Sequence, residues 1–257
     1  LIDIQLAQNQ GIAHIVQKLI RAGNMDNGRV NGDHRVFFHS IAAEQQRIEE
    51  FKRGIVNGHK FVDLGLPSGT LWADYNIGTS NPIEFGKYFA WGECVEKDAY
   101  DWNTYKWCNK SYNTLTKYCT ENIYGKTDNK IILESNDDAA TILLGSPWST
   151  PTKEDFIELM NECKWYWSFL LGVDGYLVIG RNDNSIFLPA AGCRFSVEYC
   201  GKGERGYYWS SSLDEIDPYD AYYLAFSPTA YLESNSFHLA SSYDRNHGMS
   251  IRAVIHK

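Results

Sequence analysis

The chain has 257 residues, of which 44% are hydrophobic and 22% charged, so it can bury a core and is not a disordered polymer. Its net charge of −8 argues against a nucleic-acid-binding protein that depends on broad attraction to phosphates. No apolar run approaches the roughly 18 residues that a membrane-spanning helix needs, so no transmembrane segment is expected.

The aromatic residues divide the chain into two modules. The first 58 residues contain three Phe and no Trp, Tyr or Cys, whereas all eight Trp, seventeen Tyr and six Cys lie further along. We therefore predict one module over residues 1–58 and a second over residues 59–257.

The first module is predicted to be a helical hairpin. Between residues 12 and 20 the apolar side chains recur at the spacing of one helical face. A turn-rich stretch follows at 24–32, Asp33 can cap a second helix, and Asn57-Gly58 is expected to end that helix. The hairpin either packs on its own chain or serves as a stalk or docking module that forms a homo-oligomer.

The second module is predicted to be an α+β domain. Helices are expected at 136–144, with acidic residues in the first turn, and after a capping box that begins at Thr152. The tryptophans Trp72, Trp91, Trp148 and Trp209 should be buried in a single core. The expected strands are 61–66, 70–73, 175–179, 185–188, 207–212, 221–226 and 250–255.

The residues that usually carry catalysis or bind metals are sparse in the second module. It has no histidine between His59 and His238, no CxxC, and no histidine pair at metal-ligand spacing. We expect no catalytic centre, no cofactor and no metal. The cysteine pairing stays open: Cys193 with Cys200, and Cys108 with Cys119, are close enough for disulfides, and free buried thiols are equally consistent with the sequence.

Seven short motifs follow one another through the second module: FVDLGLPSGTLWA at 61–73, YFAWGE at 88–93, DDAAT at 137–141, PTKEDF at 151–156, FLPAAG at 187–192, GYYWSSS at 206–212 and GMSIRAV at 248–254. Together they resemble the Fibrobacter succinogenes major paralogous domain family of gut Bacteroidetes. They run through residues 60–257 in family order, and the helical module lies outside the resemblance.

The resemblance implies a C-type-lectin-like fold, a twisted antiparallel sheet with flanking helices and long loops. Some similar proteins are variable proteins of diversity-generating retroelements, in which a mutagenic reverse transcriptase alters codons near the 3′ end and the altered side chains form a ligand-binding face. The cysteine motif of the related formylglycine-generating enzymes and the calcium-dependent sugar motifs of lectins have no match in this sequence.

The C-terminal stretch has the composition of a binding face independently of the family. Residues 207–247 contain seven Tyr and eight Ser, residue types that antibody combining sites favour. Alternation along 221–226 places Leu224 and Phe226 in the core and turns Tyr223 and Ala225 outward. The predicted ligand-binding side chains are Asp214, Asp217, Tyr219, Asp220, Tyr223, Ala225, Tyr231, Ser234, His238, Ser241, Tyr243, Asp244, Asn246 and His247.

The charge of this stretch indicates the kind of ligand. Between residues 213 and 247, six acidic side chains accompany a single basic one, Arg245, so the face should favour cationic or hydroxyl-rich partners. The expected function is a non-enzymatic receptor or adhesin, at the cell surface or extracellular, that binds a protein or glycan. The alternatives are an enzyme that acts on surface glycans or proteins through carboxylates such as Asp214, Glu215, Asp217 and Asp220, or ordinary solvated loops.

Overall fold

The computed structural model describes residues 25–26, 29–30, 53–228, 237–238 and 242–257. Contacts divide the chain into two compact units, residues 1–51 and residues 52–257. In the first unit, β1 (Met25–Asp26) pairs antiparallel with β2 (Arg29–Val30), within the predicted turn-rich stretch. The helices predicted before residue 53 lie outside the described residues. The prediction that they form a homo-oligomer therefore stays a prediction.

Asn57-Gly58 forms a β-hairpin turn, and the prediction that it ends a helix is wrong. β3 (Arg53–Val56) pairs antiparallel with β4 (His59–Asp63), and the two turn residues have φ of 53° and 80°. Two positive φ values are the requirement of the type I′ turn, for which Asn-Gly is the favoured pair. The boundary between the units therefore precedes this hairpin, because β3 belongs to the sheet of the second unit.

One antiparallel sheet joins the two ends of the second unit. Its strand order is β15-β5-β4-β3, in which β5 is Leu71–Ala73 and β15 is Val254–Ile255. The strand predicted at 250–255 is shorter than expected, because Ser250 and Met249 form isolated bridges to Tyr208 and Phe89 instead. The C-terminal residues thus connect this sheet to the loops and to the central strands.

Both helices predicted for the second module are present. α4 (Lys153–Glu162) begins with the predicted capping box: the Thr152 hydroxyl accepts from the Asp155 amide at 3.1 Å, and the Asp155 carboxylate accepts from the Thr152 amide at 2.7 Å. α3 (Ala139–Leu144) begins later than predicted. Its N-cap is Asp138, whose carboxylate accepts from the Ala140 amide, so Asp137 and Asp138 precede the helix.

Three further sheets complete the domain, one of them a two-stranded hairpin. β7 (Val173–Ile179) and β8 (Ser185–Pro189) form the predicted hairpin, and β6 (Lys164–Leu170) adds an edge strand that the sequence did not predict. β11 (Gly206–Leu213) pairs with β12 (Asp220–Phe226), which also pairs with β13 (Phe237–His238) and β14 (Ser242–Asp244). β9 (Cys193–Phe195) and β10 (Glu198–Cys200) form a separate hairpin. The domain is rich in sheet with few helices, an α+β architecture.

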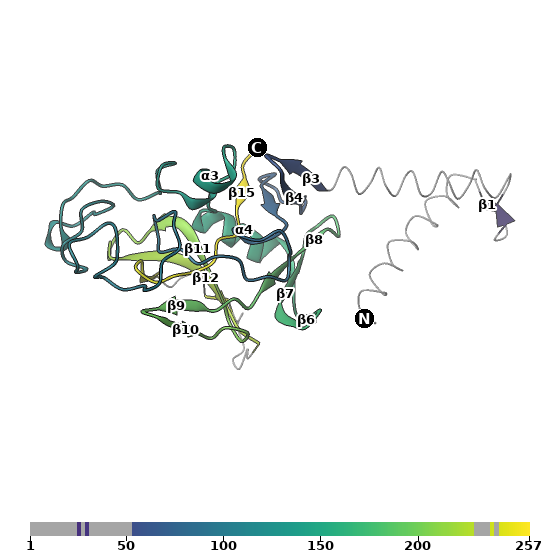
Figure 1. Cartoon of the computed structure of the whole chain (residues 1–257). Coiled ribbons are helices and arrows are strands. Elements are labelled where there is room, and N and C mark those ends of the chain that lie inside the picture. Colours follow the sequence, from purple (N-terminus) through teal and green to yellow (C-terminus); the bar gives the residue numbers. More distant parts are fainter. Residues whose placement is uncertain (1–24, 27–28, 31–52, 229–236, 239–241) are drawn as a thin grey trace. The chain divides into compact units, whose positions relative to one another are not determined.

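β11 and β12 lie side by side in the domain, with α4 packed against them (Figure 1). Both faces of this strand pair are buried: Leu224 and Phe226 pack in one apolar cluster with Phe156, whereas Trp209 and Tyr223 pack in another. The expectation of a single core is therefore wrong, because alternate residues of the same strands enter different clusters. All four tryptophans predicted to be buried are buried, which confirms that prediction.

Candidate ligand-binding face

The loop between β11 and β12 is a structured turn. The Asp214 carboxylate accepts from the amides of Ile216 at 3.0 Å and Asp217 at 3.3 Å, and the Asp220 amide donates to the Asp217 carbonyl at 2.8 Å. An Asp side chain that accepts from amides further along the chain is a common way to stabilise a turn. The loop therefore holds its side chains on a fixed backbone.

Three tyrosines from two distant parts of the sequence meet beside this loop. The ring centroid of Tyr219 lies 5.5 Å from that of Tyr112 and 5.1 Å from that of Tyr124, and the centroids of Tyr112 and Tyr124 are 6.4 Å apart. We call these three residues the tyrosine cluster. Both contacts of Tyr219 are edge-to-face, the arrangement that aromatic pairs prefer. Tyr112 is 48% exposed, so the cluster lies at the surface.

Asp217 joins the acidic loop to the tyrosine cluster. Its carboxylate accepts from the Tyr124 hydroxyl at 3.5 Å and is hydrogen-bonded to Tyr219. Burial, together with the neighbouring carboxylates of Asp217 and Asp220, raises the pKa of Tyr219 to about 12. The Thr120 hydroxyl also donates to the Glu215 carbonyl at 2.8 Å, which fixes the loop against the segment that carries Tyr124.

The turn after β14 is fixed by a buried arginine. The guanidinium of Arg245 donates to the carbonyl oxygens of Tyr118 at 2.7 Å and Lys117 at 2.8 Å, and it lies over the rings of Trp91 and Tyr105. The side chain is completely buried. The single base counted in the predicted face is therefore absent from the surface, which leaves the face more acidic than the sequence indicated.

Four predicted face residues are buried, and for them the prediction of outward side chains is wrong. Tyr223 and Ala225 are each only 7% exposed, because the second face of β12 packs against its own apolar cluster rather than facing solvent. Asn246 and His247 are buried in the turn that Arg245 fixes. His247 stacks on Phe195 with 4.8 Å between ring centroids, and burial lowers its pKa.

Of the remaining predicted residues, some reach the surface and the others lie largely outside the described residues. Tyr243 is 42% exposed and packs on Tyr223, and the other surface members are half-buried. The predicted residues that reach the surface are Asp214, Asp217, Tyr219, Asp220, Tyr243 and Asp244. Tyr231, Ser234 and Ser241 lie outside the described residues, and His238 is described only as part of β13, which pairs with β12.

Sequence reasoning missed Tyr112 and Tyr124, because they lie about a hundred residues before Tyr219 in a segment without predicted helices or strands. The available signal was the density of aromatic residues in that segment. Between residues 100 and 124 the aromatic residues are Tyr100, Trp102, Tyr105, Trp107, Tyr112, Tyr118 and Tyr124. Such a run without alternation is typical of loops that pack on their own aromatic side chains.

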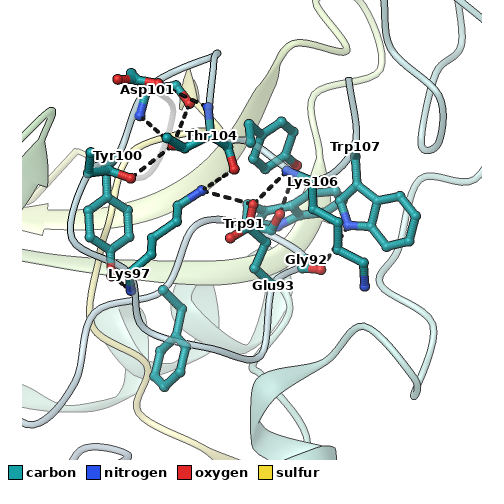
Figure 2. Close-up of polar contacts among 12 residues, drawn as sticks. Trp91, Gly92, Glu93, Lys97, Tyr100, Asp101, Thr104, Lys106 and Trp107 are labelled. Atoms are coloured by element: carbon teal, nitrogen blue, oxygen red, sulfur yellow. Dashed lines mark hydrogen bonds and ion pairs between the residues drawn. The ribbon is translucent and has the colours of Figure 1, made fainter. Parts of the chain in front are cut away.

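A polar network holds the preceding loop in place (Figure 2). The Glu93 carboxylate accepts from the Lys97 ammonium at 3.0 Å and from the Lys106 amide at 2.8 Å, and Lys97 also donates to the Thr104 carbonyl. The Trp107 indole donates to the Gly92 carbonyl at 2.8 Å. Glu93 is buried, so these bonds satisfy a carboxylate that would otherwise be costly to bury. The loop is therefore fixed over the stretch that leads to Tyr112.

Lysines 106 and 117 continue this network toward the face. Both pair with Asp137 and both lie over the Trp107 ring, with ammonium-to-centroid distances of 4.1 and 5.0 Å. Lys117 also pairs with Glu134. Lys106 and Lys117 thus already have carboxylate and aromatic partners. They therefore do not neutralise the carboxylates of the acidic loop.

The six cysteines are free thiols. The candidate pair Cys108 and Cys119 is not bridged, and their sulfurs lie near the carbonyls of Trp102 and Glu121. Cys193 and Cys200, in contrast, are directly opposite each other in the β9–β10 ladder. Burial and the neighbouring Cys200 raise the pKa of Cys193 to about 12. The two thiols are thus positioned for a cross-strand disulfide.

We expect oxidised glutathione to convert this pair to a disulfide. The exposed Cys200 would attack the glutathione disulfide, and Cys193 would then displace the second glutathione thiol, which releases two reduced glutathiones. Peptide mapping should show residues 193 and 200 linked, with the mass of two hydrogen atoms lost. Cys200→Ser should retain a free Cys193. A link from Cys193 to any other cysteine in the native protein would contradict the expectation.

A hollow of about 430 Å³ lies apart from the predicted face, lined by residues that include His59, Tyr75, Asn76 and Lys87. It contains none of the predicted ligand-binding residues. In the part of the chain that the structure describes, no three His, Cys, Asp or Glu side chains are grouped as a metal site. No helix among the described residues is long and apolar enough to cross a membrane.

Comparisons with known proteins identify no relative of this chain: no family model, no curated protein and no solved structure matches it.

Proposed function

We propose that the protein is a non-enzymatic ligand-binding receptor or adhesin of the C-type-lectin-like class, which acts at the cell surface or outside the cell. The observation that carries the proposal is the tyrosine cluster beside the acidic loop at 214–220. It combines exposed aromatic surface with hydrogen-bonding side chains on a backbone that internal bonds hold fixed. Rigid aromatic anchors of this kind dominate the energy of many binding sites.

The fold assignment in this proposal depends on the motifs that resemble the paralogous domain family. Their residues lie at the centre of the domain: Trp72, Trp91 and Trp209 are buried, and Asp138 caps α3. The motifs therefore build the scaffold, whereas the proposed binding loop lies between the GYYWSSS and GMSIRAV motifs. This division between fixed scaffold and exposed loop suits a variable protein of a diversity-generating retroelement. A reverse-transcriptase gene and template repeat beside the coding sequence would support that origin.

The binding proposal can be tested on arrays of glycans and peptides. We expect the wild-type protein to bind a restricted set of array members, and the double variant Tyr112→Ala/Tyr219→Ala to bind them at least about 30-fold more weakly, equivalent to about 2 kcal/mol. Tyr166→Ala is the matched control, because Tyr166 is 52% exposed on β6 and belongs to another sheet. The control should bind like the wild type.

Two outcomes would contradict the proposal. Equal binding by the double variant and the wild type, with unchanged thermal unfolding, would show that the ligand binds elsewhere. Chemical turnover of an array glycan that stops in Asp217→Asn would favour the enzymatic alternative instead.

A further inference from the structure

The tyrosine cluster presents aromatic surface that favours positive charge. The face of a tyrosine ring carries partial negative charge, and a cation placed within about 6 Å of its centroid is attracted. The three rings pack edge-to-face or tilted against one another, so they form one continuous aromatic surface with Tyr112 as its most exposed member.

The acidic loop beside this aromatic surface carries charges of one sign. The loop from residue 214 to residue 220 contains four carboxylates, on Asp214, Glu215, Asp217 and Asp220, and no base. Within the described residues Asp217 has hydrogen-bond partners but no ion-pair partner, and it contacts two of the three tyrosines. A carboxylate beside an aromatic ring adds a second, stronger attraction for a cation.

The chain already holds ammonium groups on another aromatic ring. Both Lys106 and Lys117 lie over Trp107 while they pair with Asp137, and Figure 2 shows Lys106 beside that ring. The tyrosine cluster with Asp217 has the same two components, an aromatic surface and a carboxylate. Among the described residues, no lysine or arginine lies over these three tyrosine rings.

Tyr199 provides an internal contrast. Its exposed fraction is 48%, the same as that of Tyr112. Its ring, however, is flanked by Arg194, whose guanidinium carbon lies 4.8 Å from the centroid, and by Lys202, whose ammonium lies 4.2 Å away. Two equally exposed tyrosines thus differ in their surroundings: cations already lie over the ring of Tyr199, whereas among the described residues none lies over that of Tyr112.

We propose that the tyrosine cluster binds an alkylammonium group, as carried by a lysine side chain or by a small quaternary amine. The inference rests on the proposed binding function and specifies the chemistry of the ligand. The ammonium would lie on the exposed tyrosine surface, with the Asp217 carboxylate as its counter-charge. A neutral group of the same shape would gain the apolar contact and lose both electrostatic attractions.

The test compares three probes by NMR titration of the tyrosine ring signals of the full chain. The probes are choline, N-acetyl-lysine amide, and 3,3-dimethylbutan-1-ol, which is the neutral isostere of choline. We expect at least one cation to bind about tenfold more tightly than the alcohol, and its binding to weaken as salt is added. Tighter binding of choline would indicate a small quaternary amine as the source, and tighter binding of the lysine derivative would indicate a protein side chain.

Three variants locate the site. Tyr112→Ala and the isosteric Asp217→Asn should each weaken binding of the cation about five- to tenfold, and Asp217→Asn should leave binding of the alcohol unchanged. Tyr199→Ala should have no effect. The inference is overturned if the alcohol binds as tightly as both cations, if neither cation shifts the signals, or if Tyr199→Ala weakens binding as much as Tyr112→Ala.

The outcomes also separate this inference from the proposed function. Array ligands that carry no positive charge, yet are lost in Tyr112→Ala/Tyr219→Ala, would leave the binding function standing and exclude the alkylammonium ligand. If cations bind at the tyrosine cluster but array ligands bind the double variant as tightly as the wild type, the protein's main binding function lies elsewhere.

Discussion

Replacing Arg252 by Met is expected to lower the free energy of unfolding by about 3–5 kcal/mol. The side chain is completely buried, and its guanidinium donates to the Asn76 side chain at 2.9 Å and to the carbonyls of Ala73, Asp74 and Phe187 at 2.8 to 3.2 Å. The substitution leaves these oxygen atoms buried without a hydrogen-bond donor. The free-energy cost of burying unpaired acceptors is larger than the net stabilisation that the same hydrogen bonds provide in the wild-type protein. Urea titration monitored by circular dichroism measures the change.

Arg181→Met is the matched control for this prediction. Arg181 pairs with the carboxylate of Glu162, but more than half of its side chain is exposed. Exposed ion pairs contribute little, so the loss should stay below about 1 kcal/mol. Equal losses in the two variants would show that the buried guanidinium does not hold the segments around residues 76 and 187 together.

Trp209→Ala is the second substitution with a large expected effect, a loss of about 3–5 kcal/mol. Trp209 is 1% exposed, its indole donates to the Phe89 carbonyl at 2.9 Å, and its ring contacts Tyr223. Truncation would open a cavity beneath β12 and leave a carbonyl without its donor. In thermal unfolding, Tyr166→Ala should shift the midpoint by about 1 °C and Trp209→Ala by roughly 10 °C.

Trp209→Phe separates the two contributions to that loss. It retains most of the apolar volume and removes the hydrogen bond, so its effect should be intermediate. A Trp209→Ala protein that unfolds at the wild-type temperature would contradict the assignment of this tryptophan to the core.

The elements that the sequence predicted well are those whose signal is local. The Thr152 capping box and the hairpin at 175–188 are fixed by residues within a few positions, and both are present. Asn57-Gly58 shows the limit of local signals, because the pair suits both a helix end and a type I′ turn. The pairing of residues 53–56 with residues 59–62 selects the turn. The sequence before Gly58 contains no pattern that predicts a strand at 53–56.

The binding face was predicted only in part, because many of the contacts that form it are not local in the sequence. Alternation along 221–226 correctly assigned Leu224 and Phe226 to an apolar cluster, but alternation gives an outward face only when the second side of a sheet meets solvent. Here that side meets Trp209 and its neighbours, so Tyr223 is buried as well. Tyr219 contacts Tyr112 and Tyr124 because the long loop that carries them packs back against the sheet. The spacing of residues in the sequence does not predict the path of such a loop.

The burial of β12 on both faces also determines where this scaffold tolerates randomisation. In a combinatorial library that varies residues 220–226, most members would fail to fold, because five of the seven side chains there pack in one cluster or the other. A library that varies Tyr112, Tyr124 and the exposed positions of 214–219 keeps both clusters intact and changes the combining surface alone. Selection from such a library would sample new specificities rather than new instabilities.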